Sequence, residues 1–144
     1  MTELFAGKTL FRHGSNGTVD AAELKGKIVA IYFSAHWCPP CRGFTPVLKT
    51  FYDNLAMTEE FEIIFASADE SKEEFKGYLK ESHGAWLYLP FEDPFALELK
   101  GKYGVSGIPS LVVVKADGSV ITKEGRKDLM EKSAEAALAA WKNA

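Results

Sequence analysis

Both cysteines of the chain lie in one short segment, Trp37-Cys38-Pro39-Pro40-Cys41. An apolar run precedes this segment and a helical pattern of apolar residues follows it, so the two thiols are predicted at a strand-to-helix junction. There Cys38 would lie at or beside the N-cap, where free backbone N–H groups and the helix dipole favour a thiolate. The pKa of Cys38 is therefore expected below the value of about 8.5 for a free cysteine.

The spacing of the two thiols suits dithiol–disulfide exchange. The Cys38 thiolate would attack a partner's disulfide and form a mixed disulfide, and Cys41, one turn further along, would then attack Cys38 and release the reduced partner. Pro39 suits a first helical turn because its missing N–H would have no partner there. Pro40 lies in the same turn, so the two prolines are expected to stiffen the ring.

Two other uses of the cysteine pair fit the sequence less well. A structural zinc site needs four ligands, whereas the chain offers two cysteines and three histidines, none of them in a typical zinc-binding His spacing. A permanent structural disulfide stays open, but so short a loop adds little stability by chain entropy. Redox chemistry is the favoured interpretation, and neither a metal nor a cofactor is expected.

The composition indicates an ordinary globular domain. The chain has 144 residues, of which 47% are hydrophobic and 26% charged. Its net charge of −3 gives no electrostatic footprint for nucleic-acid binding, and no apolar run approaches the ~20 residues of a membrane span. The first residues lack the apolar core of a signal peptide. A reducing compartment is therefore expected, the cytoplasm or also the nucleus, where such a cysteine pair is more often catalytic than structural.

Apolar periodicity predicts strands and helices that alternate around one sheet. Residues 27–34 and 61–68 are continuous apolar runs typical of buried parallel strands, and Pro46 is expected to kink the helix between them. Ser71 begins a capping box, and Asp93-Pro94 is a second helix start. An Asp-Gly pair predicts a hairpin turn. The expected elements are strands at 27–34, 61–68, 110–115 and 119–122, a half-buried aromatic segment at 85–91, and helices at 39–55, from 71 to near 84, from 93, and at 128–142.

The first 27 residues are expected to cover the sheet, with a short edge strand at 9–11 and a helical turn at 19–24. Strand, helix, strand, helix, hairpin and helix around one sheet predict an α/β domain. The chain contains no recognisable linker or repeat, so residues 1–144 are expected to form a single domain.

Several segments together resemble the nucleoredoxin and tryparedoxin branch of the thioredoxin superfamily. They are Trp37-Cys-Pro-Pro-Cys-Arg42, the flanks Tyr32-Phe-Ser-Ala-His-Trp37 and Gly43-Phe-Thr-Pro-Val-Leu48, Phe61-Glu-Ile-Ile-Phe65 with Ser67-Ala-Asp69, and Gly107-Ile-Pro-Ser110. The match covers most of residues 24–126. It implies a thioredoxin-like fold, in which helices flank both faces of a central mixed sheet, and one such domain in this chain.

The resemblance also implies roles for single residues. It makes Cys38 the nucleophile and Cys41 the resolving thiol. It makes Pro109 a cis-proline that faces Cys38, so that neighbouring main-chain groups can pair with an extended substrate peptide. The other residues expected to line the docking surface are Trp37, Pro39, Pro40 and Ile108.

The chain departs from ordinary thioredoxins at Tyr32, where they carry a buried Asp that helps to deprotonate the resolving cysteine. A tyrosine with an unperturbed pKa near 10 is a poor base at neutral pH, so the base for Cys41 is open. Asp69 and Glu70 are candidates because they follow the second strand at the same end of the sheet. Helix capping or solvation would explain these two acids equally well.

Two arginines are candidate modulators of the site. Arg126 matches a tryparedoxin position linked to recognition of a charged dithiol, although a solvated loop arginine is the favoured interpretation. Arg42, in the first turn of the active-site helix, would raise the local positive potential or only solvate the helix.

The residues and the resemblance together predict a thiol–disulfide oxidoreductase that reduces disulfides in proteins. Its expected partners are disulfide-containing protein substrates and an upstream reductant, either thioredoxin reductase, glutathione or another dithiol. A monomer without nucleic-acid or membrane contacts is expected. The alternative is a redox-dependent binding module that regulates a signalling protein or transcription factor. Partner binding that survives loss of both cysteines would favour this alternative.

Overall fold

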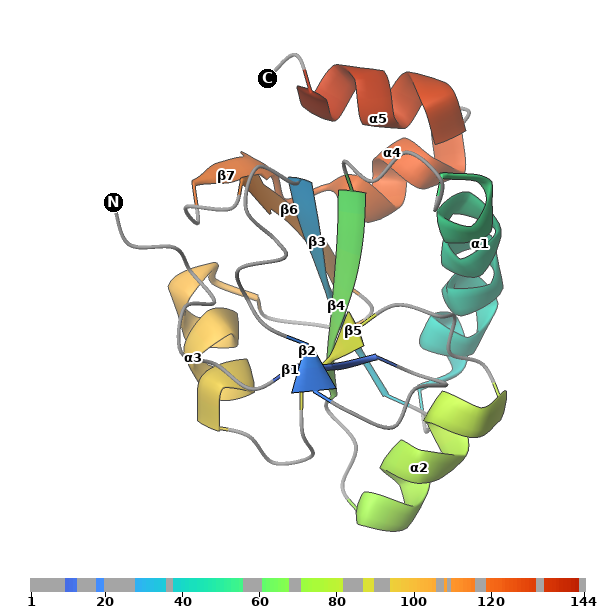
Figure 1. Cartoon of the computed structure of the whole chain (residues 1–144), viewed down its shortest axis with the longest axis vertical. Coiled ribbons are helices and arrows are strands. Elements are labelled where there is room, and N and C mark those ends of the chain that lie inside the picture. Colours follow the sequence, from blue (N-terminus) through green and yellow to red (C-terminus); the bar gives the residue numbers. More distant parts are fainter. Residues whose placement is uncertain are drawn as a thin grey trace.

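The computed structural model describes residues 10–12, 18–19, 28–35, 38–55, 61–67, 71–81, 87–89, 94–105, 108, 110–115, 119–131 and 134–142. These residues contain a seven-stranded sheet with the strand order β2-β1-β5-β4-β3-β6-β7 (Figure 1). The strands are β1 (Leu10–Arg12), β2 (Thr18–Val19), β3 (Ile28–Ser34), β4 (Phe61–Ser67), β5 (Leu87–Tyr88), β6 (Ser110–Lys115) and β7 (Val120–Thr122). The helices are α1 (Pro39–Leu55), α2 (Lys72–Glu81), α3 (Pro94–Lys102), α4 (Gly125–Glu131) and α5 (Ala134–Lys142).

The sheet is mixed, as predicted. Parallel pairing joins β3 to β4 and β4 to β5, and the other neighbouring strands pair antiparallel. Ile28 of β3 lies opposite Phe61 of β4, and Ser34 lies opposite Ser67, so the two strands start and end together. All seven residues of β3 are buried, because a central strand with both faces covered contacts no solvent.

Helices cover both faces of the sheet, which confirms the predicted architecture. In Figure 1, α1 and α2 lie on one side and α3 on the other. The α1-side core includes Phe44, Leu48 and Phe51, whose three- and four-residue spacing places them on one face of α1. The α3-side core contains Leu99 and those buried side chains of β3, β4 and β6 that lie on the same face of the sheet as α3. Pro46 lies inside α1, which continues through it, and its kink stays a prediction.

The local signals for two helix starts are confirmed. The Glu74 N–H donates to Ser71 Oγ over 3.1 Å, so Ser71 is the N-cap of α2. Helix α3 begins at Pro94, whose fixed φ and missing N–H suit a first helical position.

The prediction for the N-terminal residues was partly wrong. Strand β1 lies inside the sheet, between β2 and β5, and is not an edge strand. Val19, expected in a helical turn, belongs to β2 and pairs with Leu10. Whether two or three residues form a strand depends on pairing with a partner strand distant in sequence more than on their own residue types. These residues therefore extend the sheet, whereas they were expected to cover it.

The single helix predicted at 128–142 is two helices, α4 and α5. The Trp141 Nε1–H donates to Asp128 Oδ2 over 2.9 Å. In one straight helix these residues would be about 20 Å apart, at 1.5 Å per residue. The chain therefore has to turn between the two helices for the indole to reach the carboxylate.

Helix α3 ends in a Schellman motif, which the sequence analysis did not identify. Gly104 has a φ of 62°, the Gly104 N–H donates to the Gly101 C=O over 3.3 Å, and the Val105 N–H donates to the Lys100 C=O over 2.9 Å. This left-handed residue redirects the chain from α3 towards Ile108, which lies against the cysteine pair.

Gly104→Ala is expected to lower the free energy of unfolding by about 1 kcal/mol, because an L-residue in the left-handed region costs ~1–2 kcal/mol. Gly101→Ala is the matched control. A Cβ there would meet nothing within 4 Å, and alanine favours the helix by roughly 0.5–1 kcal/mol over glycine. Urea denaturation should shift the two variants in opposite directions. Equal shifts of the same sign would contradict the role of the left-handed cap.

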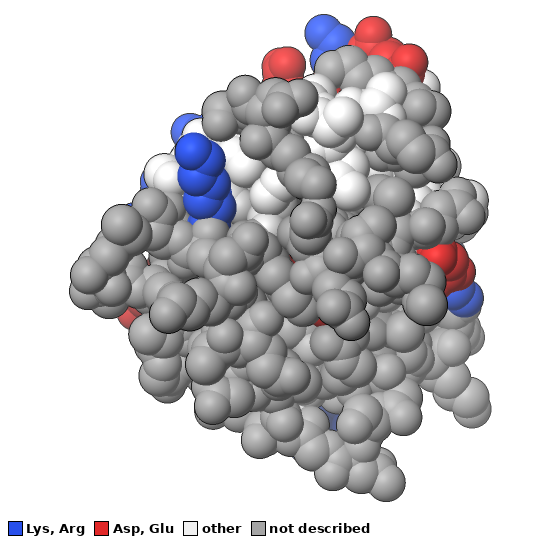
Figure 2. Space-filling view, turned by 45° about the horizontal axis from the view of Figure 1, so that its top comes forward, with Lys and Arg blue, Asp and Glu red and all other residues white. Residues whose placement is uncertain are grey.

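On the face drawn in Figure 2, the described residues include charged side chains of both signs, mainly near the top and the sides of the view. Among the helices of the described ranges, none is long and apolar enough to cross a membrane. Within the same ranges, no group of three or more His, Cys, Asp or Glu side chains could hold a metal ion.

Candidate active site

The cysteine pair lies at the N-terminus of α1, directly beyond the end of β3. Helix α1 begins at Pro39, and the Cys38 C=O accepts the Arg42 N–H over 3.1 Å as the first bond of the helix. The Cys38 N–H donates to the Ala35 C=O over 3.3 Å and so closes the turn between strand and helix. Cys38 is therefore the N-cap residue, as predicted.

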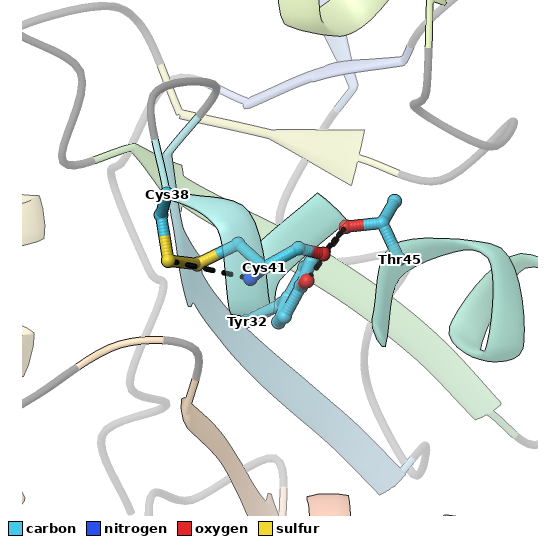
Figure 3. The surroundings of a disulfide bond; sticks show 4 residues. All are labelled: Tyr32, Cys38, Cys41 and Thr45. Atoms are coloured by element: carbon cyan, nitrogen blue, oxygen red, sulfur yellow. Dashed lines mark hydrogen bonds between the residues drawn. A yellow bond between two sulfur atoms is a disulfide. The ribbon is translucent and has the colours of Figure 1, made fainter. Parts of the chain in front are cut away.

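Cys38 and Cys41 are joined by a disulfide (Figure 3). Their Cα atoms are 5.2 Å apart, within the usual range for such bonds. Cys38 keeps 4% of its surface exposed and Cys41 none. Cys41 is therefore the more deeply buried of the two residues, and it lies behind Cys38 in the first turn of the helix.

One backbone N–H of the first helical turn faces the Cys38 sulfur. Pro39 and Pro40 have no N–H, and the Arg42 N–H is used by the helix. The Cys41 N–H donates to Cys38 Sγ over 3.3 Å. A donor in this position, at the positive end of the helix dipole, stabilises a thiolate on Cys38 once the disulfide is reduced.

Two buried hydroxyl groups connect the Cys41 main chain to the sheet. Tyr32 Oη of β3 lies 2.7 Å from Thr45 Oγ1 of α1, and Thr45 Oγ1 donates to the Cys41 C=O over 2.8 Å. Figure 3 shows the Tyr32 hydroxyl directed to Thr45 and the Cys41 carbonyl, on the far side of Cys41 from the Cys38 sulfur. We call this pair of contacts the hydroxyl bridge.

Three apolar residues lie at the rim of the site. Ile108 is partly exposed and packs against the cluster formed by Ala35 and the two cysteines. Pro39 and Pro40 are exposed at the start of α1. Trp37 and Pro109, also expected here, lie outside the described residues, so their roles and the cis bond at Pro109 stay predictions.

Of the charged candidates, the structure places the two arginines. Arg126 lies in the first turn of α4 and not in a loop, and its guanidinium Cζ is 6.0 Å from the centroid of the Phe44 ring. Arg42 is exposed on α1. Asp69 and Glu70 lie outside the described residues.

Sequence reasoning missed Thr45. A usable signal was present, because a threonine inside a helix often bonds the carbonyl four residues earlier, and here that carbonyl belongs to Cys41. What the helix pattern could not show is that Thr45 is buried and meets Tyr32.

A family model described as thioredoxin-like matches residues 26–120. The chain is 43% identical over 130 residues to nucleoredoxin from Mus musculus, an alignment that covers 89% of this chain and 29% of that protein. It thus spans less than a third of the length of that relative. Two solved structures are also similar. A thioredoxin from Wuchereria bancrofti has a TM-score of 0.84 at 45% identity, with 99% of each chain covered. Tryparedoxin II complexed with glutathionylspermidine has a TM-score of 0.81 at 39% identity, with 92% of each chain covered.

Proposed function

The chain belongs to the thioredoxin-like family, and we propose that it is a protein-disulfide reductase acting by dithiol–disulfide exchange. The observation that carries this proposal is the disulfide at a helix N-terminus, in which the Cys41 N–H is directed to the Cys38 sulfur and Cys41 is fully buried. A permanent structural disulfide needs no donor directed to one of its sulfurs. An exchange site needs one stabilised thiolate and one protected thiol behind it.

In the proposed cycle the reduced protein supplies two electrons to a substrate disulfide. The Cys38 thiolate attacks one substrate sulfur, the substrate S–S bond breaks, and the first substrate sulfur leaves as a thiolate that takes up a proton. Cys41 then loses its proton and attacks Cys38 Sγ. The mixed disulfide breaks, the second substrate thiol leaves, and the Cys38–Cys41 disulfide has formed. An external dithiol or two equivalents of glutathione return the pair to the reduced state.

The substrate is proposed to dock on the apolar rim of Ile108, Pro39 and Pro40, together with Trp37. A cis Ile108–Pro109 bond would turn main-chain groups towards Cys38, where they pair with an extended peptide as a short added strand. The packing of Ile108 against the cysteine cluster supports this placement. Main-chain pairing carries little sequence information, so broad selectivity among protein disulfides is expected.

Charged groups near the site are proposed to tune the two half-reactions. Asp69 or Glu70 would accept the Cys41 proton, and Arg42 would raise the positive potential beside Cys38. Arg126 is proposed to attract an anionic part of the reductant or substrate. Tryparedoxin II, 39% identical, has been solved with glutathionylspermidine, which supports a glutathione-type reductant among the candidates. We propose that residues 1–144 form one thioredoxin-like domain, that the protein is a monomer, and that it lies in the cytoplasm or also in the nucleus.

The proposal is tested with insulin, whose interchain disulfides dithiothreitol reduces slowly. Catalytic amounts of the protein are expected to accelerate the precipitation of the insulin B chain. The pace of this turbidity, compared with dithiothreitol alone, is the measurement. No acceleration, combined with binding of partner proteins that survives replacement of both cysteines, would instead favour the redox-dependent binding module.

A further inference from the structure

The hydroxyl bridge holds the resolving cysteine from the side opposite to the substrate. Tyr32 and Thr45 each keep 1% of their surface exposed, and Cys41 none. The bridge connects β3 with α1 through residues that are 13 positions apart. Buried hydroxyl groups without hydrogen bonds would cost roughly 1–3 kcal/mol each, so these contacts are strongly favoured within the folded chain.

The direction of the bridge follows from counting protons. A hydroxyl has one hydrogen, and the Thr45 hydrogen points to the Cys41 C=O, which can only accept. The hydrogen between Tyr32 Oη and Thr45 Oγ1 therefore belongs to Tyr32. In this arrangement the Tyr32 phenol donates its proton to Thr45 and is not aimed at the Cys41 thiol.

Both polar groups of the Cys41 main chain are thereby engaged. Its N–H donates to Cys38 Sγ over 3.3 Å, and its C=O accepts the Thr45 hydroxyl over 2.8 Å. The carbonyl end is tied to the sheet through Tyr32, while the N–H end is tied to the nucleophilic sulfur. These two contacts fix the main chain of Cys41, and with it the Cα from which the side chain extends towards Cys38.

We infer that Thr45 and Tyr32 are positioning residues for the resolving thiol, which keep Cys41 Sγ within reach of Cys38 Sγ while a mixed disulfide occupies Cys38. This inference rests on the proposed dithiol–disulfide exchange. Resolution is an intramolecular attack, so its rate depends on how well the two sulfurs are held in line. The first attack, by Cys38 on an external disulfide, does not use Cys41 Sγ and gains nothing from the bridge.

The two steps can be separated with dithiobis(nitrobenzoate), a symmetrical disulfide that releases a coloured thiolate at each step. One equivalent of the reduced protein releases the first thiolate when Cys38 attacks and the second when Cys41 resolves the mixed disulfide. Stopped-flow absorbance follows both phases in one experiment. Thr45→Val, close in shape but without the hydroxyl, is expected to slow the second phase about tenfold and leave the first within about twofold.

Tyr32→Phe is expected to slow the second phase less, about threefold, because Thr45 still bonds the Cys41 carbonyl. The double variant should be no slower than Thr45→Val, because the Tyr32 hydroxyl acts on the Cys41 carbonyl only through Thr45. Thr45→Ser should restore the second phase. Thr50→Val is the matched control, because Thr50 Oγ1 makes the same kind of bond to the Pro46 C=O on the exposed side of α1.

Three results would overturn the inference. They are an unchanged second phase in Thr45→Val, equal slowing of both phases, and a larger loss in Tyr32→Phe than in Thr45→Val, which would make Tyr32 act on the thiol directly. If Thr45→Val does not fold, the volume-conserving Tyr32→Phe decides, and an unchanged second phase there refutes the bridge. Wild-type protein that releases both thiolates but does not reduce insulin would refute the proposed function alone.

Discussion

Replacing Cys38 by serine is expected to reduce the acceleration of insulin reduction to the rate of dithiothreitol alone. A serine hydroxyl is not ionised near neutral pH and cannot form a mixed disulfide. Cys41 cannot take over, because it is fully buried behind Cys38 in the first turn of α1. Insulin turbidity measured at equal concentrations of wild-type and Cys38→Ser protein checks this expectation.

Cys41→Ser is the matched control, because it removes the same disulfide but keeps the Cys38 sulfur. It should attack a substrate once and then remain linked to it, which a mass increase that dithiothreitol reverses would show. Loss of so short a disulfide loop costs about 2 kcal/mol by the chain-entropy relation, less than the ~5–15 kcal/mol that usually stabilises a domain. Both variants should therefore stay folded. Turnover by Cys38→Ser equal to that of the wild type would refute the assignment of the nucleophile.

Trp141→Ala is expected to lower the free energy of unfolding by about 3–5 kcal/mol, as for other large aromatic residues truncated in a core. Trp141 is 2% exposed, and its ring lies 5.5 Å from Phe51 and 5.8 Å from Phe61 between centroids. Its indole N–H bonds the Asp128 carboxylate, so the variant also loses the contact between α5 and α4. For a domain of this size, the loss corresponds to a melting temperature lower by about 10–15 °C.

Thermal unfolding followed by far-UV circular dichroism measures this shift. Met130→Ala is the control for truncating a large apolar side chain on α4, because Met130 is 63% exposed and should change the free energy of unfolding by less than ~0.5 kcal/mol. Below its melting temperature, Trp141→Ala should reduce insulin at the wild-type rate. The reason is that Trp141 packs on Phe61, which lies opposite Ile28 at the start of β3. The disulfide follows the other end of that strand. A melting temperature within 2 °C of the wild type, roughly 0.6 kcal/mol at this size, would contradict the expected contribution of Trp141 to the core.

The sequence by itself determined the centre of the site and the class of the fold. Cys38 and Cys41 are placed by local rules, since an apolar run, two prolines and a helical stripe put any such pair at a helix N-terminus. The apolar runs at 27–34 and 61–68 predicted buried central strands, and β3 and β4 are those strands. The N-cap at Ser71 could also be predicted from the sequence, because a cap is a contact between residues three positions apart.

Tertiary structure alone decided the features that depend on residues distant in sequence. Strand β1 lies within the sheet because β2 and β5 pair with it, and its three residues carry no such information. The division of the C-terminal segment into α4 and α5 goes with the hydrogen bond from the Trp141 indole to the Asp128 carboxylate, which one straight helix could not form. Arg126, read as a loop residue, lies in a helix and over an aromatic ring.

The hydroxyl bridge shows the same division within the site. That a hydroxyl at position 45 can bond the carbonyl of residue 41 is a local property of a helix. That this hydroxyl is buried and receives the proton of Tyr32 depends on how α1 packs against β3. Periodicity gives the face of each element, but the depth and rotation at which two faces meet are set by the packing of the whole core.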